Sequence, residues 1–188
     1  MIYAKVEDGN LVLSHTQWDS SFTAFNVPDT TWLYVSGSSV SAYSTSQYIQ
    51  NIALPQALSQ LAYEATQTIY SAYPSYKQNT DMLHMQMYEA ELASYTISAQ
   101  AFKQQIMQMV ASIYSSTNPP SSYTQQLSSL TSSYTMLSSS MLQDSLNIGC
   151  RLAFVQNIIN QYKSFSSQLV SSSTLPLPSY TFQGVWLP

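Results

Sequence analysis

Few residues of this sequence could do acid, base or metal chemistry, and they lie apart from one another. The two histidines, His15 and His84, are in separate segments, and neither belongs to a local cluster of Cys, His, Asp and Glu such as a zinc site needs. Glu89 and Glu91 are two positions apart, so on a helix they point to different faces, whereas paired catalytic carboxylates share one surface. We therefore expect no metal ion and no cofactor, and we interpret both glutamates as solvated charges.

Motifs for nucleophilic or nucleotide chemistry are also missing from the sequence. Serine is abundant, but no serine lies in a Gly-x-Ser-x-Gly motif, and the four glycines leave no phosphate-binding loop of the Walker or dinucleotide type. The single cysteine, Cys150, excludes an intramolecular disulfide and a Cys-x-x-Cys motif. We interpret it as a buried small apolar residue, with an intermolecular disulfide as the alternative. The sequence thus predicts a protein without catalytic residues and without enzymatic activity.

Asp144 and Arg151 are charges of a different kind, because the helical pattern places both on an apolar seam, seven residues apart. An unpaired charge buried in such a seam would cost several kcal/mol. We expect the two residues to pair with each other across subunits, which would fix the register of an assembly, or to reach solvent at a local opening. The alternative is that Gly149 rotates both of them out of the interface.

The seam itself is the most informative pattern in the sequence. Apolar residues recur in steps of three and four, which is the spacing of a left-handed coiled coil. We predict one long helix over 75–116 and a second over 121–170, separated by Pro119 and Pro120, which cannot continue a helix. Gly149 is expected to bend or divide the second helix, with assembly contacts concentrated beyond it. The expected assembly seam comprises Met85, Tyr88, Leu92, Tyr95, Phe102, Ile106, Met109, Ile113, Leu127, Leu130, Tyr134, Leu137, Met141, Val155, Ile158, Tyr162 and Phe165.

Both ends of the chain are predicted to be non-helical. Asp8-Gly9 between two β-prone runs is a strong hairpin signal, and a second β-type stretch follows Pro28. The C-terminal segment is rich in serine and proline and then aromatic, so we expect an extended arm that docks on the β segment or on a neighbouring chain. The expected docking residues of this arm are Tyr180, Phe182 and Trp186.

These elements define a mainly α fold, a long antiparallel helical hairpin or coiled-coil bundle with a small N-terminal β cap and an extended C-terminal arm. The expected parts are the β cap over 1–45, a first helix over 46–73, the long helical hairpin over 74–170 and the arm over 171–188. Helices this long cannot fold back into an ordinary globule, so we expect copies of the chain to cover the surface that remains exposed.

Composition limits the partners of such a protein. Only 7% of the residues are charged while 45% are hydrophobic, and the net charge is −4. Neutral polar side chains tolerate burial against another subunit, so a homo-oligomer is expected. The five lysines and arginines form no basic stripe, which disfavours nucleic-acid binding, and no apolar run is long enough to span a membrane.

A resemblance points to one kind of assembly. The segment 1–10 (MIYAKVEDGN), followed by 29–37 (DTTWLYVSG), resembles the N-terminal segment of bacteriophage tail-fibre and tail-fibre-assembly proteins. This resemblance implies a structural protein of the virion, in the tail, at the head-tail junction or associated with the capsid, with other virion proteins as partners. It implies no functional residues. The alternative is a secreted or surface helical interaction module, such as an effector, adhesin or toxin.

Overall fold

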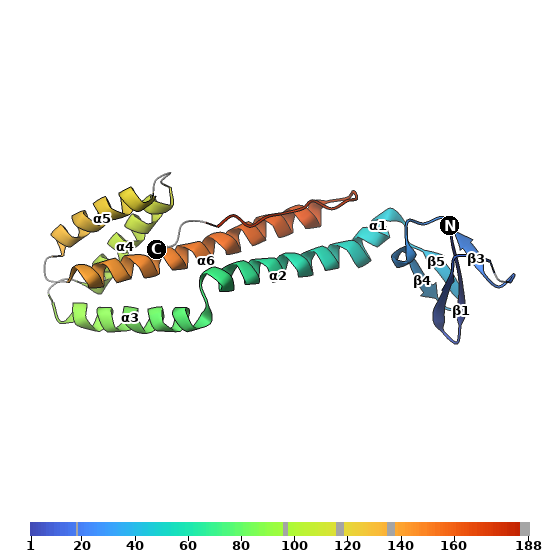
Figure 1. The fold of residues 1–188 in the computed structure, drawn as a ribbon, viewed down its shortest axis with the longest axis horizontal. Helices are drawn as coiled ribbons and strands as arrows, with labels where there is room; N and C mark the ends of the chain where they lie inside the picture. Colours follow the sequence, from blue (N-terminus) through green and yellow to red (C-terminus); the bar gives the residue numbers. More distant parts are fainter. Residues whose placement is uncertain (18, 96–97, 116–118, 135–137, 185–188) are drawn as a thin grey trace. The chain divides into compact units, whose positions relative to one another are not determined.

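The computed structural model describes residues 1–17, 19–95, 98–115, 119–134 and 138–184. Two compact units make up the chain. The first comprises Met1–Gln60 and Ser166–Ser179, and the second comprises Leu61–Phe165 and Tyr180–Pro188. The fold is mainly helical with a small antiparallel sheet near the N-terminus, which confirms the predicted fold class at this level (Figure 1).

The sheet of the first unit begins with the predicted hairpin. β1 (Ile2–Glu7) pairs antiparallel with β2 (Asn10–Ser14), and β3 (Thr23–Phe25) pairs with the other edge of β1. Asp8 and Gly9 form the turn with φ of 51° and 78°, the left-handed pair that a two-residue hairpin loop requires. β4 (Leu33–Ser36) and β5 (Ser39–Ala42) form a second hairpin.

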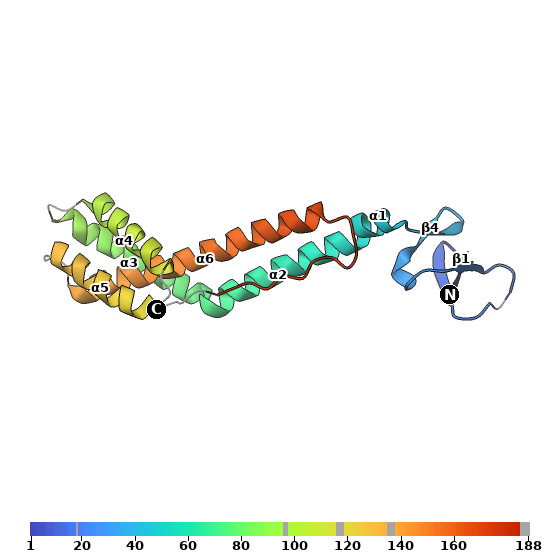
Figure 2. The same ribbon diagram turned by 90° about the horizontal axis from the view of Figure 1, so that it is seen from above.

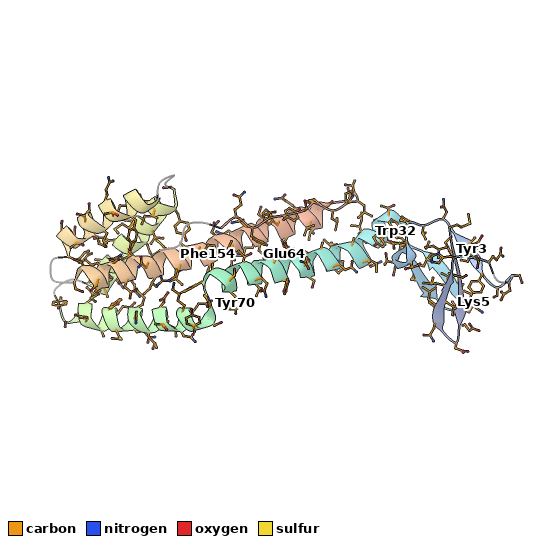
Figure 3. All side chains as sticks on the ribbon, viewed as in Figure 1. Tyr3, Lys5, Trp32, Glu64, Tyr70 and Phe154 are labelled. Atoms are coloured by element: carbon orange, nitrogen blue, oxygen red, sulfur yellow. The ribbon has the colours of Figure 1, made fainter. Side chains whose placement is uncertain are left out.

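Short helical segments lie on both sides of the second hairpin in the sequence. A 3-10 turn (Thr30–Trp32) precedes β4, and α1 (Thr45–Tyr48) and a π-helical turn (Ile49–Ala53) follow β5. The ring of Trp32, labelled in Figure 3, stacks on Tyr48 with 4.1 Å between the ring centroids. Ile2, Ala4 and Leu33 form the small buried core. The aromatic stack therefore ties the strands to the start of the helical region.

Five helices continue the chain, and α2 and α6 have residues in both units. Their bounds are Leu54–Ala72 for α2, Ser75–Ala93 for α3, Ala99–Tyr114 for α4, Pro119–Ser133 for α5 and Ser139–Ser171 for α6. Within the second unit, α4 packs on α5 and also contacts α3, and α6 lies alongside these helices (Figures 1 and 2).

The long helices predicted over 75–116 and 121–170 are not continuous. The first is divided into α3 and α4, because the Ser94 hydroxyl donates to the carbonyl of Glu91 at the end of α3 while the Ser98 hydroxyl caps the start of α4. The second is divided into α5 and α6, and the Ser138 hydroxyl accepts from the backbone N–H of Met141 in the same way. Local serine caps thus end and restart helices within a sequence whose apolar spacing is continuous.

Most of the predicted seam residues are buried in, or packed against, apolar cores formed within the chain. Four helices contribute to one core, with Leu92 from α3, Phe102 and Ile106 from α4, Leu130 from α5 and Leu146 from α6 among its members. The consequence of breaking each long helix is that its two halves fold against each other. A long coiled-coil hairpin is therefore replaced by a shorter group of helices around a shared core.

Gly149 has a different role from the predicted bend, since α6 is continuous through it. A Cβ atom built on Gly149 would lie 2.7 Å from Cγ2 of Val110 and 3.1 Å from Cγ2 of Ile106, both on α4. These distances are shorter than van der Waals contact. Gly149 is therefore a position at which α6 approaches α4 closely, and the missing side chain makes that approach possible.

We predict that Gly149→Val lowers the free energy of unfolding by about 2 kcal/mol, as overpacking of a tight core contact does. The control is Lys163→Val, which adds the same side chain at an exposed position of α6 and should change stability by less than about 0.5 kcal/mol. Adding Val110→Ala to Gly149→Val should recover part of the loss, because it removes the clashing methyl groups. Chemical denaturation measures all three, and equal stability of the two valine variants would contradict the close approach.

Candidate functional site between α3 and α6

Three polar side chains on the face of α3 that packs against α6 form hydrogen bonds to that helix. Asp81, His84 and Tyr88 follow one another at spacings of three and four residues, so they lie in a row. Each of them bonds to a residue of α6. This row and its partners Asp144 and Arg151 form what we term the polar seam.

The first contact of the polar seam is a buried ion pair. Nε of Arg151 donates to Oδ2 of Asp81 at 2.6 Å, and both side chains are only 6% exposed. The hydroxyl of Tyr73, in the turn between α2 and α3, donates to the same Oδ2 at 2.9 Å. Gln78 in turn donates to the backbone carbonyl of Tyr73 and so holds this turn against α3. Burial, and then the hydrogen bond to Asp81, raise the pKa of Tyr73 to about 12, so its phenol remains protonated.

The second contact lies farther along the same helices and is more open to solvent. Nδ1 of His84 lies 2.8 Å from Oδ2 of Asp144, and the hydroxyl of Tyr88 donates to the same oxygen at 2.6 Å. Burial and the hydrogen bond to Asp144 raise the pKa of Tyr88 to about 12. A histidine–aspartate pair can serve a nucleophile, but in the described residues no serine or cysteine side chain hydrogen-bonds to the His84 ring. We therefore interpret this contact as a second tie between the helices.

A groove of about 590 Å³ lies beside the buried ion pair. Its walls are mostly apolar and include Met85 of α3 and Ile148 and Val155 of α6. Glu89 and Lys103, which form an ion pair with each other, line it as well. Because its charges are paired, the groove offers no free charge to a ligand, and among the described residues no group of His, Cys, Asp and Glu is arranged to bind a metal ion.

The two predicted registry charges, Asp144 and Arg151, do not pair with each other. Both lie in the polar seam, and both find their partners on α3 of the same chain. The prediction failed because a seven-residue spacing says nothing about which helix packs opposite. The sequence feature that could have identified the partners of Asp144 and Arg151 was the row Asp81, His84 and Tyr88, because its spacing places these side chains on one helix face.

The described residues of the expected seam divide between four places in the second unit. Leu92, Phe102, Ile106, Ile113, Leu130, Tyr134 and Met141 are buried in the four-helix core, with Tyr88, Tyr95, Met109 and Leu127 packed around it. Val155, Ile158 and Tyr162 belong to a second cluster that α6 forms with Ala65 and Ile69 of α2, and Phe154, labelled in Figure 3, is buried there. Met85 lines the groove, Phe165 contacts the arm, and Leu137 lies outside the described residues.

The described residues Tyr180, Phe182 and Gln183 of the C-terminal arm contact α6. Tyr180 stacks on Phe165 of α6 with 4.6 Å between ring centroids, and Phe182 lies 5.5 Å from the same ring. The side-chain amide of Gln161 donates to the carbonyl of Gln183 and accepts from its N–H, so it pairs with the arm as another strand would. Trp186 lies outside the described residues.

Cys150 is buried in the core, as a small apolar residue is. Burial raises the pKa of its thiol to about 11, which keeps it protonated. Tyr114 of α4 donates a hydrogen bond to its backbone carbonyl. The thiol in this position is neither a nucleophile nor available for a disulfide with another chain.

No family model matches this chain, and no curated protein or solved structure matches it either. Over the described residues, the helices are too short or too polar to cross a lipid bilayer. The function must therefore be argued from the geometry of the helices and their surfaces.

We predict that Arg151→Met lowers the free energy of unfolding by about 3–5 kcal/mol, because it leaves the Asp81 carboxylate buried without its counter-charge. Adding Asp81→Leu should restore most of this loss, since two apolar side chains then replace the pair. Lys163→Met is the matched control, at an exposed position of the same helix with no ion pair among the described residues.

Urea unfolding followed by circular dichroism gives the free energy of unfolding of each of these three variants and of the wild-type protein. A double variant as unstable as Arg151→Met alone would show that the ion pair does not carry the stability of this contact.

Proposed function

We propose that this protein is a non-enzymatic structural component of a virus particle, in the tail, at the head-tail junction or associated with the capsid. It acts by packing its helices against other subunits, which include further copies of the same chain. The particle assignment rests on the resemblance of segments 1–10 and 29–37 to tail-fibre and tail-fibre-assembly proteins. The assembly role rests on a surface of α3.

The observation that carries the assembly role is the inverted polarity of α3. The buried carboxylate of Asp81 faces α6, whereas large apolar side chains, Leu83 and Met87 among them, are more than half exposed on the opposite face. A helix in a monomeric protein normally has the reverse arrangement. An exposed apolar row of this kind favours a protein that completes its packing by contact with another protein surface.

The composition supports the same proposal. With 7% charged residues, few surface positions carry a charge that would resist burial in an assembly. In the described residues the charges of Asp81 and Arg151 are paired within the chain, as are those of Glu89 and Lys103, and Asp144 contacts His84. Such contacts hold the fold and use several of the few charged side chains within the chain.

A second candidate is a secreted or surface interaction module, and one observation favours it. A shallow pocket of about 340 Å³ is lined by Tyr63 and Glu64 of α2 and by Tyr180 and Phe182 of the arm. An exposed ring of Tyr63 and the partly buried rings of Tyr180 and Phe182 beside a carboxylate suit the recognition of a sugar or a peptide. This pocket involves different residues from the apolar face of α3, so the two candidates do not compete for one site.

The test is quantitative mass spectrometry of virus particles produced from the genome that encodes this chain. The particles are purified on a density gradient and washed at high salt, and an abundant non-structural protein of the same lysate serves as the contamination control. We expect peptides of this chain at a fixed ratio to a major capsid protein through both steps, with the control protein lost. Loss of the chain together with the control would reject the virion role, and recovery from the medium or cell surface instead would favour the second candidate.

A further inference from the structure

α3 carries an uninterrupted coiled-coil stripe on the face that points away from α6. The stripe consists of Tyr76, Thr80, Leu83, Met87 and Ala90, in steps of four, three, four and three, and Ser94 extends it by one further step. All of these residues are exposed, with Tyr76, Leu83 and Met87 at 73%, 57% and 64%. In Figure 1 α3 lies at the outer edge of the second unit, on the opposite side of α6 from α5. We infer that this stripe is a self-association surface on which α3 of a second copy packs in antiparallel orientation.

The period of the stripe is the first argument. A spacing of 3.5 residues keeps a seam on one side of a helix only if that helix winds around a partner. The seam formed inside the chain uses the opposite face of α3, where Tyr88 and Leu92 contact the core. α3 therefore has two helical faces with a packing pattern, and no described residue covers the outer one.

Charge around the stripe is the second argument, and it selects a second copy of the same chain. Lys77 and Glu91 flank the stripe on the same side, fourteen residues or two heptads apart, and neither has an ion-pair partner among the described residues. In an antiparallel pair of α3 helices, the lysine of each chain comes next to the glutamate of the other. The two-fold axis makes both contacts at once, so a single surface is complementary to itself.

The sizes of the stripe residues agree with the same register. When Leu83 faces Met87 of the other chain, Thr80 faces Ala90 and Tyr76 faces Ser94. Each large side chain at the ends is thus opposite a small one, and the two central layers are apolar. A parallel pair would instead place tyrosine on tyrosine at one end and would leave the lysine and glutamate too far apart to meet.

The length of the contact sets the expected strength. α3 has 19 residues, which span about 28 Å at a rise of 1.5 Å per residue. A two-helix contact of this length is at the small end of specific interfaces, so the pair should dissociate on dilution. This inference deepens the proposed assembly function and rests on it in taking the partner to be another copy of this chain.

The first experiment measures the mass of the full-length protein by sedimentation equilibrium from nanomolar to high-micromolar concentration. We expect a reversible monomer–dimer equilibrium, and Leu83→Glu should weaken it by at least about 100-fold because two carboxylates then face the central layers. Met107→Glu is the control, since Met107 of α4 is 71% exposed and lies off the stripe, and it should leave the equilibrium unchanged. Circular dichroism establishes that each variant is folded, and Met87→Glu replaces Leu83→Glu if the latter is not.

Two results of this experiment would overturn the inference. One is a wild-type protein that remains a monomer over the whole concentration range. The other is a Leu83→Glu or Met87→Glu variant that dimerises as strongly as the Met107→Glu control, because the dimer would then form through another surface.

The second experiment tests the orientation by exchanging the flanking charges. Lys77→Glu alone and Glu91→Lys alone should each weaken the dimer several-fold at low salt, since each places like charges together at two points. The double variant Lys77→Glu/Glu91→Lys should return to the wild-type dissociation constant. A double variant weaker than either single one would overturn the antiparallel register.

These results are distinguishable from those that bear on the particle. A protein that dimerises through the stripe but is missing from purified particles would reject the virion role and leave this inference standing. A chain that is present in particles but dimerises normally with Leu83→Glu would reject this inference alone.

Discussion

The buried ion pair between Arg151 and Asp81 determines which face of α3 is turned toward the rest of the protein. Two charges that are 6% exposed are tolerated only when they satisfy each other, and the pair forms in one rotational setting of α3 against α6. Tyr73 adds a second donor to the same carboxylate oxygen, so the turn that enters α3 is fixed together with the helix. Asp144 and His84 repeat the contact farther along and hold the helices in register.

The outer surface of α3 follows from this constraint. When Asp81 faces α6, the helix geometry places Leu83 and Met87 on the outer face, where the exposure of their apolar surface to water is unfavourable. Burial of α3 in the opposite rotational setting would hide these side chains but would leave Arg151 without its carboxylate. The orientation of α3 in the single chain therefore depends in part on one electrostatic contact, and the proposed assembly would use the apolar face that this orientation leaves exposed.

Part of the fold and of the polar seam could be predicted from the sequence, and the remaining part could not for physical reasons. The Asp8-Gly9 hairpin was predictable because its turn chemistry is local, and the buried residues Leu92, Phe102 and Leu130 were predictable as a core from their spacing. The spacing of apolar residues does not indicate whether a seam packs against another chain or against the other half of the same predicted helix. The caps at Ser98 and Ser138 divide the predicted helices, and the halves can then pack on each other. The partners of Asp144 and Arg151 were missed because α3 and α6 are far apart in the sequence, and Gly149 was interpreted as a flexible point although it is a packing contact.

We infer that α3 turns its apolar face outward and that α3 of a second copy of the chain covers this face. Oxidation of methionines by peroxide, read by mass spectrometry as a function of protein concentration, tests both parts in one measurement. At high dilution Met87 and Met107 should oxidise rapidly, and Met141, which is buried in the core, should oxidise slowly. As the concentration rises, Met87 should become protected while Met107 should not. Protection of Met87 already at high dilution, or an equal response of Met87 and Met107 to concentration, would contradict the account.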